Sequence, residues 1–388
     1  MIKHEIPDDI AELVSFQNLL FSHDCIVDVP LIEDLGFAAD SFVMYLSIRP
    51  FQTKKLVESI HKYINIPGFI DLLVPKSIIS CPYLLYIIFN NNLITIDIIQ
   101  RYLKKKRNFL AASYFYKQIP NYKIFGYHLI ESHNHSEHLG LLNNFPFLAD
   151  EAKDELIKFG YPMNSVEYML KYDDIESFRE RTKNPGFYWK DMVIKSVYDW
   201  INITEYSNLL SFSAIFGSIK CFKYIVSNGV VIDDQTVAHS LYSGSTDLIR
   251  LISNFNLQNY YQELSYWFHE DVSQWIIDTY QGNNMEMMSF SNLRCVLNCT
   301  ENQTDLRTLY ENGLTFYEYS IQKGYYHIFN YLNTIGSEPI RENNNPLLIK
   351  AAMGGCVRIA KYLLNTISNV NVSNAKYIFN IIHLLLFM

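Results

Sequence analysis

Small, glycine and apolar positions recur in a fixed order along the second half of the chain. Three segments align without gaps: SAIFGSIKCFKYIVSNG (213–229), SIQKGYYHIFNYLNTIG (320–336) and AAMGGCVRIAKYLLNTI (351–367). In each, a glycine stands four positions after the first of two small or apolar residues, and an apolar stripe at i, i+1 and i+4 follows it. Such a stripe forms one buried helix face, and glycine ends a helix because it adopts a positive φ freely. The pattern therefore predicts pairs of short helices joined by a glycine turn.

Weaker copies of the same pattern lie between these segments. The turn position is held by Gly217, Gly324 and Gly355 in the strong copies, and by Gly244, Asp271 and Glu301 in the copies at 240–252, 267–277 and 297–313. Gly229 and Gly336 are expected to end the second helices, and Ser218 is expected to be exposed. The stripe residues expected to be buried are Cys221, Phe222, Ile225, Leu248, Ile249, Ile252, Trp275, Ile276, Leu306, Leu309, Ile328, Phe329, Leu332, Ile359, Ala360 and Leu363.

The segment AAMGGCVRIAKYLL resembles an ankyrin repeat over nearly a full helix pair. The blocks YDDIESFRERTKNPGFYW (172–189) and FSAIFGSIKCFKYIVSNG (212–229) are similar to the divergent, short-period ankyrin proteins that are expanded in some protists. The Thr-Pro-Leu-His opening of an ankyrin helix is absent, and Pro346-Leu347-Leu348 is the nearest approach to it. The resemblance implies an all-α, ankyrin-type helix-pair solenoid that binds a partner protein on its concave face. Because the shortest copies fall below the ~33 residues of an ankyrin repeat, the β-hairpins between repeats are expected to be reduced.

The N-terminal region, residues 1–148, is also predicted to be helical. Candidate helices span 8–22, 52–64, 82–90, 93–106 and 109–117. The stretch 118–148 is the least regular and is the expected junction, after which 150–160 reads as a helix closed by Gly160. We therefore expect an N-terminal helical region at 1–148 and an ankyrin-like solenoid at 149–388, with about six to seven helix pairs and the last one incomplete.

Composition narrows the class of protein further. Hydrophobic residues make up 49% of the chain and charged residues 19%, which is typical of a folded protein with a large core. The net charge of −8 does not favour binding to the negatively charged phosphate backbone of a nucleic acid, so nucleic acid is not an expected partner. The six scattered cysteines fit free thiols in a reducing compartment, which favours a cytoplasmic location.

One cluster of titratable residues supports an alternative function based on metal or catalytic chemistry. The segment HLIESHNHSEH places His128, His133, His135 and His138 close together, and the last two share a helix face as metal ligands can. A metal-binding protein or hydrolase using this cluster is therefore one alternative function. Cys295 and Cys299 also share a helix face, but free cysteines commonly serve as small core residues. With no phosphate loop and no nucleophile motif in the sequence, we assign no catalytic, cofactor or metal residues.

The C-terminal segment YIFNIIHLLLFM (377–388) supplies a second alternative. Its 12 residues are too few to cross a bilayer, so we expect the first half of an unfinished repeat. A membrane-associated effector using this apolar tail is the alternative, although a membrane is not the favoured partner. The sequence is best explained by a non-enzymatic, cytoplasmic scaffold or adaptor that needs no cofactor and binds another protein.

Overall fold

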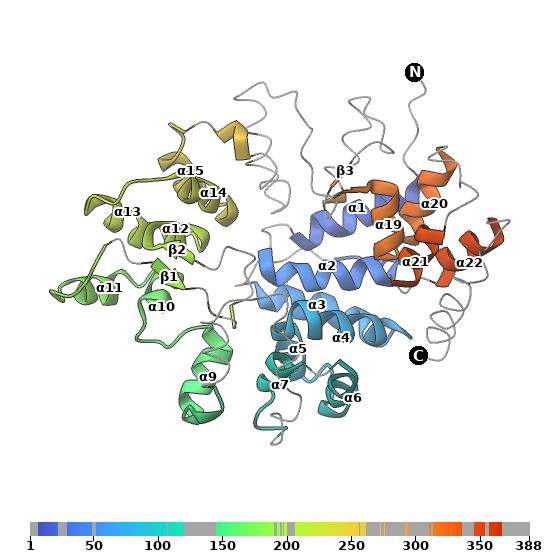
Figure 1. The fold of residues 1–388 in the computed structure, drawn as a ribbon, viewed down its shortest axis with the longest axis horizontal. Helices are drawn as coiled ribbons and strands as arrows, with labels where there is room; N and C mark the ends of the chain where they lie inside the picture. Colours follow the sequence, from blue (N-terminus) through green and yellow to red (C-terminus); the bar gives the residue numbers. More distant parts are fainter. Residues whose placement is uncertain are drawn as a thin grey trace. The chain divides into compact units, whose positions relative to one another are not determined.

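The structure is a computed structural model of the full chain. It describes residues 7–21, 29–48, 52–106, 108–119, 145–189, 192–194, 196, 198–199, 206–255, 257–260, 272, 275, 292–293, 310–311, 313–335, 345–353 and 357–366. Helices account for most of these residues, so the predicted all-α class is confirmed (Figure 1). None of the described helices has both the length and the apolar character that crossing a membrane requires.

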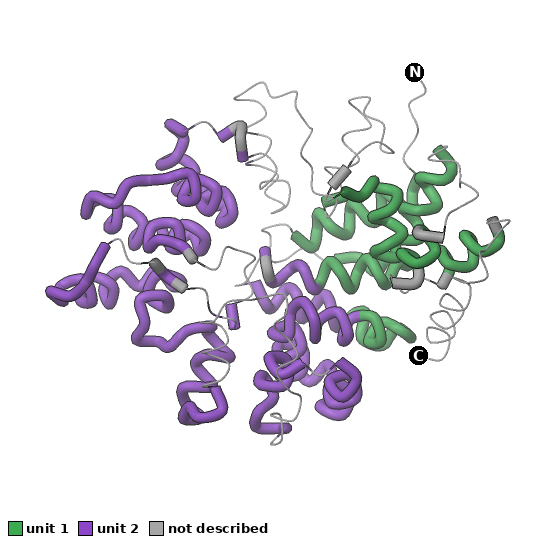
Figure 2. Tube along the Cα trace, in the orientation of Figure 1, with its two compact units in different colours: residues 1–42, 62–72, 284–388 green, residues 43–61, 73–283 purple. Residues whose placement is uncertain are grey.

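Contacts divide the chain into two compact units (Figure 2). Unit 1 comprises residues 1–42, 62–72 and 284–388, and unit 2 comprises 43–61 and 73–283. This grouping does not follow the expected boundary after residue 148, because helices near the N-terminus pack with segments more than 250 residues later in the sequence.

Unit 1 combines the first helices with the last helix pairs. Its elements are α1 (Asp8–Phe21), the first part of α2 (Leu35–Ile48), β3 (Tyr310–Glu311), β4 (Leu314–Thr315), α19 (Phe316–Lys323), α20 (Tyr326–Thr334), α21 (Asn345–Met353) and α22 (Val357–Thr366). α1 packs on α20, where His327 Nδ1 lies 3.0 Å from Asp9 Oδ2. The rings of Phe37 and Tyr325 are 5.0 Å apart, and Gln17 accepts a hydrogen bond from the backbone N–H of Leu293.

Six described helices follow α1 before residue 120, and residues 62–72 at the end of α3 and the start of α4 belong to unit 1. The six helices are α2, α3 (Thr53–Tyr63), α4 (Phe69–Ser80), α5 (Pro82–Asn90), α6 (Ile96–Lys106) and α7 (Phe109–Ser113). Each of the expected helices at 8–22, 52–64, 82–90, 93–106 and 109–117 is present. The observed helices span 8–21, 53–63, 82–90, 96–106 and 109–113, so the last one is four residues shorter than expected. α2 and α4 were not expected, because both are apolar on most of their surface and show little of the amphipathic period that marks a helix in a sequence.

Helix pairs make up the later part of unit 2. The elements are a 3-10 turn (Phe145–Phe147), α9 (Asp150–Phe159), α10 (Val166–Lys171), α11 (Ile175–Thr182), β1 (Met192–Ile194), β2 (Tyr206–Asn208), α12 (Leu209–Ile215), α13 (Ile219–Ser227), α14 (Asp234–Ser243), α15 (Thr246–Leu251) and a 3-10 turn (Leu257–Tyr260). The first helices of consecutive pairs contact one another, α10 on α12 and α12 on α14, and α11 contacts α13. β1 and β2 form a short antiparallel pair, while the connection 228–233 contains no strand, as the short spacing predicted.

Tyr198 connects the early helices of unit 2 to its helix pairs. Its hydroxyl lies 2.9 Å from Ser113 Oγ at the end of α7. Its ring packs 5.3 Å from Tyr114 and 5.4 Å from Phe145. This aromatic contact explains why helices before residue 120 and pairs after residue 145 belong to one unit.

The predicted glycine turns are present wherever the structure describes them. Gly217, Gly244 and Gly324 have φ values of 70°, 63° and 77°, and Gly160 and Gly229 end their helices at 85° and 86°. The expected turns at Asp271, Glu301 and Gly355, and the helix end at Gly336, lie outside the described residues.

Two further turns have the same left-handed geometry without glycine. Asp173 (φ 54°) joins α10 to α11, and Asn92 (φ 58°) joins α5 to α6. After each, the next backbone N–H donates to the carbonyl five residues earlier. This hydrogen bond joins Leu93 to Ile88 (2.9 Å), Asp174 to Met169 (2.9 Å), Ser218 to Ser213 (3.0 Å) and Tyr325 to Ser320 (2.9 Å). The helix-pair turn therefore occurs also in the N-terminal region.

Burial follows the predicted stripes with two corrections. The stripe residues found buried are Cys221, Phe222, Ile225, Leu248, Ile249, Ile252, Ile328, Phe329, Leu332, Ile359, Ala360 and Leu363. Trp275 is 40% exposed, so its predicted burial is wrong; an indole ring is too large to be covered fully at most positions. Ser218 was expected to be exposed but is buried, because it faces the preceding helix pair and its Oγ donates to the carbonyl of Leu170. Ile276, Leu306 and Leu309 lie outside the described residues.

Candidate functional site

The two alternative sites named from the sequence lie outside the residues that the structure describes. His128, His133, His135 and His138 lie outside the described residues, as do Cys295, Cys299 and the segment 377–388. Within the part of the chain that the structure describes, no three His, Cys, Asp or Glu side chains are grouped as metal ligands. Burial raises the thiol pKa of Cys81 to about 12 and also raises that of Cys221, so both remain protonated core residues at neutral pH.

A buried ion pair lies beneath the helix pairs of unit 2. Lys171 Nζ lies 3.2 Å from Asp199 Oδ2 and donates to the carbonyl of Phe159 (3.0 Å). The side chains of Lys171 and Asp199 are only 8% and 2% exposed. Burial also raises the pKa of neighbouring Tyr161 well above its ordinary value, so its hydroxyl stays neutral and accepts from the N–H of Ser196. Because these groups are enclosed, they are part of the interior of the unit and offer no approach to a ligand.

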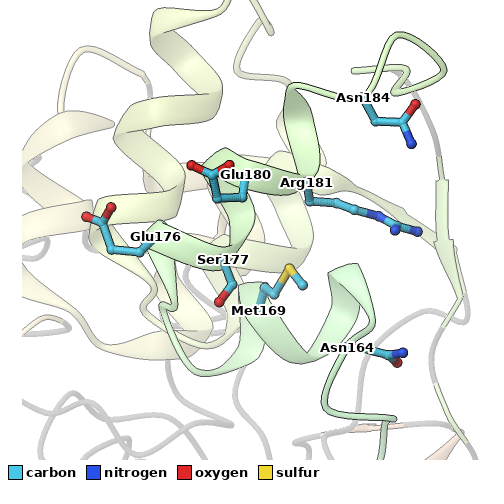
Figure 3. A pocket seen from close by; sticks show the side chains of 7 residues that line it. All are labelled: Asn164, Met169, Glu176, Ser177, Glu180, Arg181 and Asn184. Atoms are coloured by element: carbon cyan, nitrogen blue, oxygen red, sulfur yellow. The ribbon is translucent and has the colours of Figure 1, made fainter.

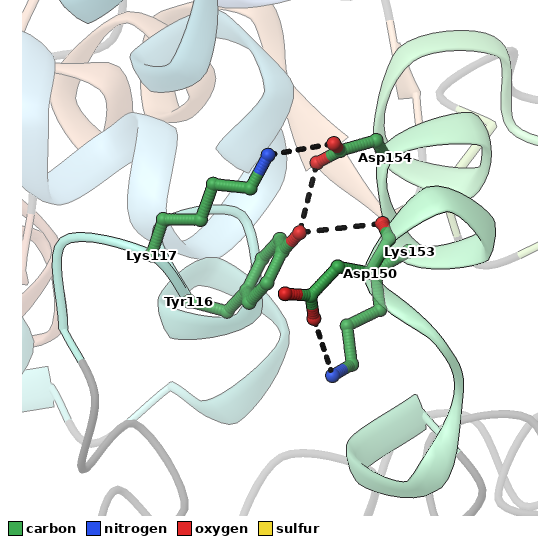
Figure 4. Close-up of polar contacts among 5 residues, drawn as sticks. All are labelled: Tyr116, Lys117, Asp150, Lys153 and Asp154. Carbon is green, nitrogen blue, oxygen red and sulfur yellow. Dashed lines mark hydrogen bonds and ion pairs between the residues drawn. The ribbon is translucent and has the colours of Figure 1, made fainter.

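A second polar cluster joins the end of α7 to α9 (Figure 4). The hydroxyl of Tyr116 donates to Asp154 Oδ1 (2.9 Å) and lies 3.3 Å from the carbonyl of Asp150. Lys117 pairs with Asp154 at 2.6 Å, and Lys153 pairs with Asp150 at 3.2 Å. Burial, together with the hydrogen bond to Asp154, raises the pKa of Tyr116 to about 12. Each charge in the cluster has an opposite charge beside it, which indicates a structural tie between the two segments.

An open hollow lies between α10 and α11 in unit 2 (Figure 3). It has a volume of about 680 Å³. Both polar and apolar atoms face it, and the residues that line it are Asn164, Met169, Glu176, Ser177, Glu180, Arg181 and Asn184. A hollow lined by several polar side chains is suited to recognising a ligand or a segment of another protein.

Local hydrogen bonds fix the two helices that form this hollow. Ser165 caps α10 by accepting from the N–H of Tyr168 (3.1 Å), and Asp174 caps α11 by accepting from the N–H of Ser177 (3.1 Å). Capping of this kind stabilises a helix end by about 1 kcal/mol. The positive φ of Asp173 between them reverses the chain within one residue. The side chains of both helices are therefore held in a defined relation around the hollow.

The lining of α11 departs from the stripe found in the later pairs. Counting from the turn, Ser177 and Arg181 occupy the positions held by the buried Cys221 and Ile225 in α13. In α11 only the middle stripe residue, Phe178, is buried. The face that later pairs bury is therefore polar in α11, and it opens into the hollow. In the sequence, Tyr-Asp-Asp-Ile at 172–175 matches Phe-Gly-Ser-Ile at 216–219, but Asp173 stands where the repeat pattern has a glycine.

Comparison with known proteins does not assign the chain to a family. No protein-family model matches the chain, and a search of curated proteins finds no match.

Proposed function

We propose that this protein is a non-enzymatic scaffold or adaptor that binds another protein through its helix pairs. The observation that carries the proposal is the open hollow on α10 and α11. It lies on a face of α11 whose equivalent in α13 is buried. Stacked helix pairs present extended surfaces, and their function depends on those surfaces more than on enclosed reactive groups. A cytoplasmic location belongs to the same proposal and rests on the cysteine pattern.

The ankyrin-type classification is part of this proposal. Three features support it: left-handed turns at Gly217, Gly244 and Gly324, buried stripes after each turn, and consecutive pairs whose first helices contact one another. The reduced connection at 228–233 supports the short-period form of the repeat. The proposed partner surface is therefore the face of the stack that carries the hollow.

Affinity capture with the purified full chain tests this function. The bait is the wild-type chain, and Ser177→Trp fills the hollow with an indole ring. Ser227→Trp is the matched control, because Ser227 is exposed on α13 and does not line the hollow. We expect one protein to be captured in stoichiometric amount by the wild type and by the control. Filling the hollow should weaken its binding by about tenfold or more, a loss of at least ~1.4 kcal/mol measured by calorimetry with the purified partner.

Two results would count against the proposal. If no protein is captured in stoichiometric amount, the chain is not a scaffold. If Ser177→Trp and Ser227→Trp bind the partner equally well, the partner surface lies elsewhere on the chain and the hollow is only the solvated end of a stack.

A further inference from the structure

Charges around the hollow are balanced except at one residue. Glu176 pairs with Arg179 in α11 at 3.5 Å, and Glu180 pairs with Lys183, the residue that follows α11. The guanidinium group of Arg181 has no ion pair or hydrogen bond with another described residue, whereas its backbone carbonyl accepts from the N–H of Asn184 (3.2 Å). After internal pairing, the uncompensated charge that lines the hollow is therefore one guanidinium group.

Two amides accompany this guanidinium. In Figure 3 the side chain of Arg181 extends between those of Asn164 and Asn184. The Oδ1 atom of Asn184 accepts from the N–H of Gly186 (3.0 Å), so its Nδ2 remains to donate. This end of the hollow is therefore rich in hydrogen-bond donors, and the planar fork of a guanidinium matches a carboxylate with two parallel hydrogen bonds.

We propose that the hollow binds an acidic segment of a partner protein, with a carboxylate side chain placed against Arg181 between Asn164 and Asn184. This inference rests on the proposed function, since it names the chemistry of the partner for the same site. The chain's net charge of −8 opposes a polyanion such as nucleic acid, which leaves a short segment with few carboxylates as the occupant. The remaining lining consists of a hydroxyl, a thioether and the carboxylates of Glu176 and Glu180, which are paired with Arg179 and Lys183. The hydroxyl and the thioether suit the backbone and small side chains of an extended peptide.

A peptide titration tests the inference. The probe is Gly-Ala-Glu-Ala-Glu-Ala-Gly with acetylated and amidated ends and a neutral dye, so only side chains carry charge; its glutamine counterpart is the control peptide. Binding to the full chain is followed by fluorescence polarisation at low salt. We expect saturable binding of the glutamate peptide, about tenfold weaker binding of the glutamine peptide, and about tenfold weaker binding of the glutamate peptide to Arg181→Gln.

Matched variants separate recognition from general charge. Arg250→Gln removes the same charge from an exposed site on α15 in the same unit and should change the affinity less than about twofold. Arg181→Lys keeps the charge but loses the fork, so its affinity should lie between those of the wild type and Arg181→Gln.

Several outcomes would overturn the inference. They are no saturable binding of the glutamate peptide, equal effects of Arg181→Gln and Arg250→Gln, and equal binding of the glutamine peptide. If only a glutamine peptide with a free carboxyl end binds tightly, the hollow recognises a chain terminus and not an acidic side chain, and the inference is also overturned. If Arg181→Gln leaves the affinity for the captured partner unchanged, the scaffold proposal stands while the acidic segment is excluded.

Discussion

Asp173 performs two structural tasks, and substitutions can separate them. Its backbone adopts a positive φ of 54°, which reverses the chain between α10 and α11. Its carboxylate accepts hydrogen bonds from the backbone N–H groups of Lys220 (3.0 Å) and Cys221 (2.9 Å), in the first turn of α13. The residue at the start of α13, Ser218, provides no side-chain cap, because its hydroxyl donates to Leu170. Asp173 therefore caps a helix of the neighbouring pair.

The expected magnitudes follow from these two tasks. Loss of a helix cap costs about 1 kcal/mol, and placing alanine in the left-handed region costs about 1 kcal/mol more. We therefore expect Asp173→Ala to destabilise α13 by about 2 kcal/mol. Asp173→Gly loses only the cap and should cost about 1 kcal/mol or less, because glycine adopts this φ freely. Asp173→Asn retains one acceptor oxygen and tolerates the turn, so its effect should be the smallest of the three.

Amide hydrogen exchange in α13 measures these effects locally, which suits a chain of two units that need not unfold together. A loss of about 2 kcal/mol corresponds to roughly 30-fold faster exchange at Lys220 and Cys221. Asp174→Ala is the matched control, because Asp174 caps its own helix by accepting from Ser177, so its effect should appear in α11. Equal exchange in the alanine and glycine variants of Asp173 would refute the positive φ, and equal effects of Asp173→Ala and Asp174→Ala on α13 would refute the cap between pairs.

Three further expectations concern the same unit. Burial lowers the pKa of His239 from 6.5 to about 4, so unfolding takes up a proton as the pH falls below 6.5; thermal melts should show a loss of about 2 kcal/mol from pH 7 to pH 5 that His239→Leu removes. Gly217→Val should destabilise the fold by about 1 kcal/mol or more, because φ at this residue is 70°. Lys223→Val, at an exposed position, should cost less. Equal shifts in melting temperature for the two variants would contradict the left-handed turn at Gly217. Asp199→Asn should lower the free energy of unfolding by about 3 kcal/mol, because it leaves the buried charge of Lys171 without its partner. In urea titrations, the double variant Lys171→Met with Asp199→Leu should recover most of that loss. A double variant no more stable than Asp199→Asn would contradict this reasoning.

The features that could be predicted from the sequence are those with local causes. A glycine adopts a positive φ whatever surrounds it, so the turns at Gly217, Gly244 and Gly324 could be placed from their residue type and spacing. The apolar stripes after these turns could be placed for the same reason, since their spacing follows from the helix period.

The features that were missed depend on tertiary contacts. Asp173 holds a left-handed turn while its carboxylate is bound by a helix about 47 residues later, and the sequence does not reveal that contact. Ser218 is polar and yet buried, because a carbonyl of the preceding pair accepts its proton. The hollow was missed because Ser177 and Arg181 break the apolar stripe, and a broken stripe in a sequence looks the same as an ordinary solvated helix face.

Unit 1 combines segments that are far apart in the sequence, and this has a consequence for its synthesis on the ribosome. Asp9 in α1 meets His327 in α20, 318 residues later. At about 5–20 residues per second, α1 leaves the ribosome roughly 15–60 s before its partner helix does. Most of unit 2 is a continuous stretch, 73–283, and emerges within that interval. The contact between the rings of Phe37 and Tyr325 therefore forms only after the stretch 73–283 has been synthesised. Nascent α1 and α2 are the segments of unit 1 for which a ribosome-associated chaperone has the longest opportunity to bind.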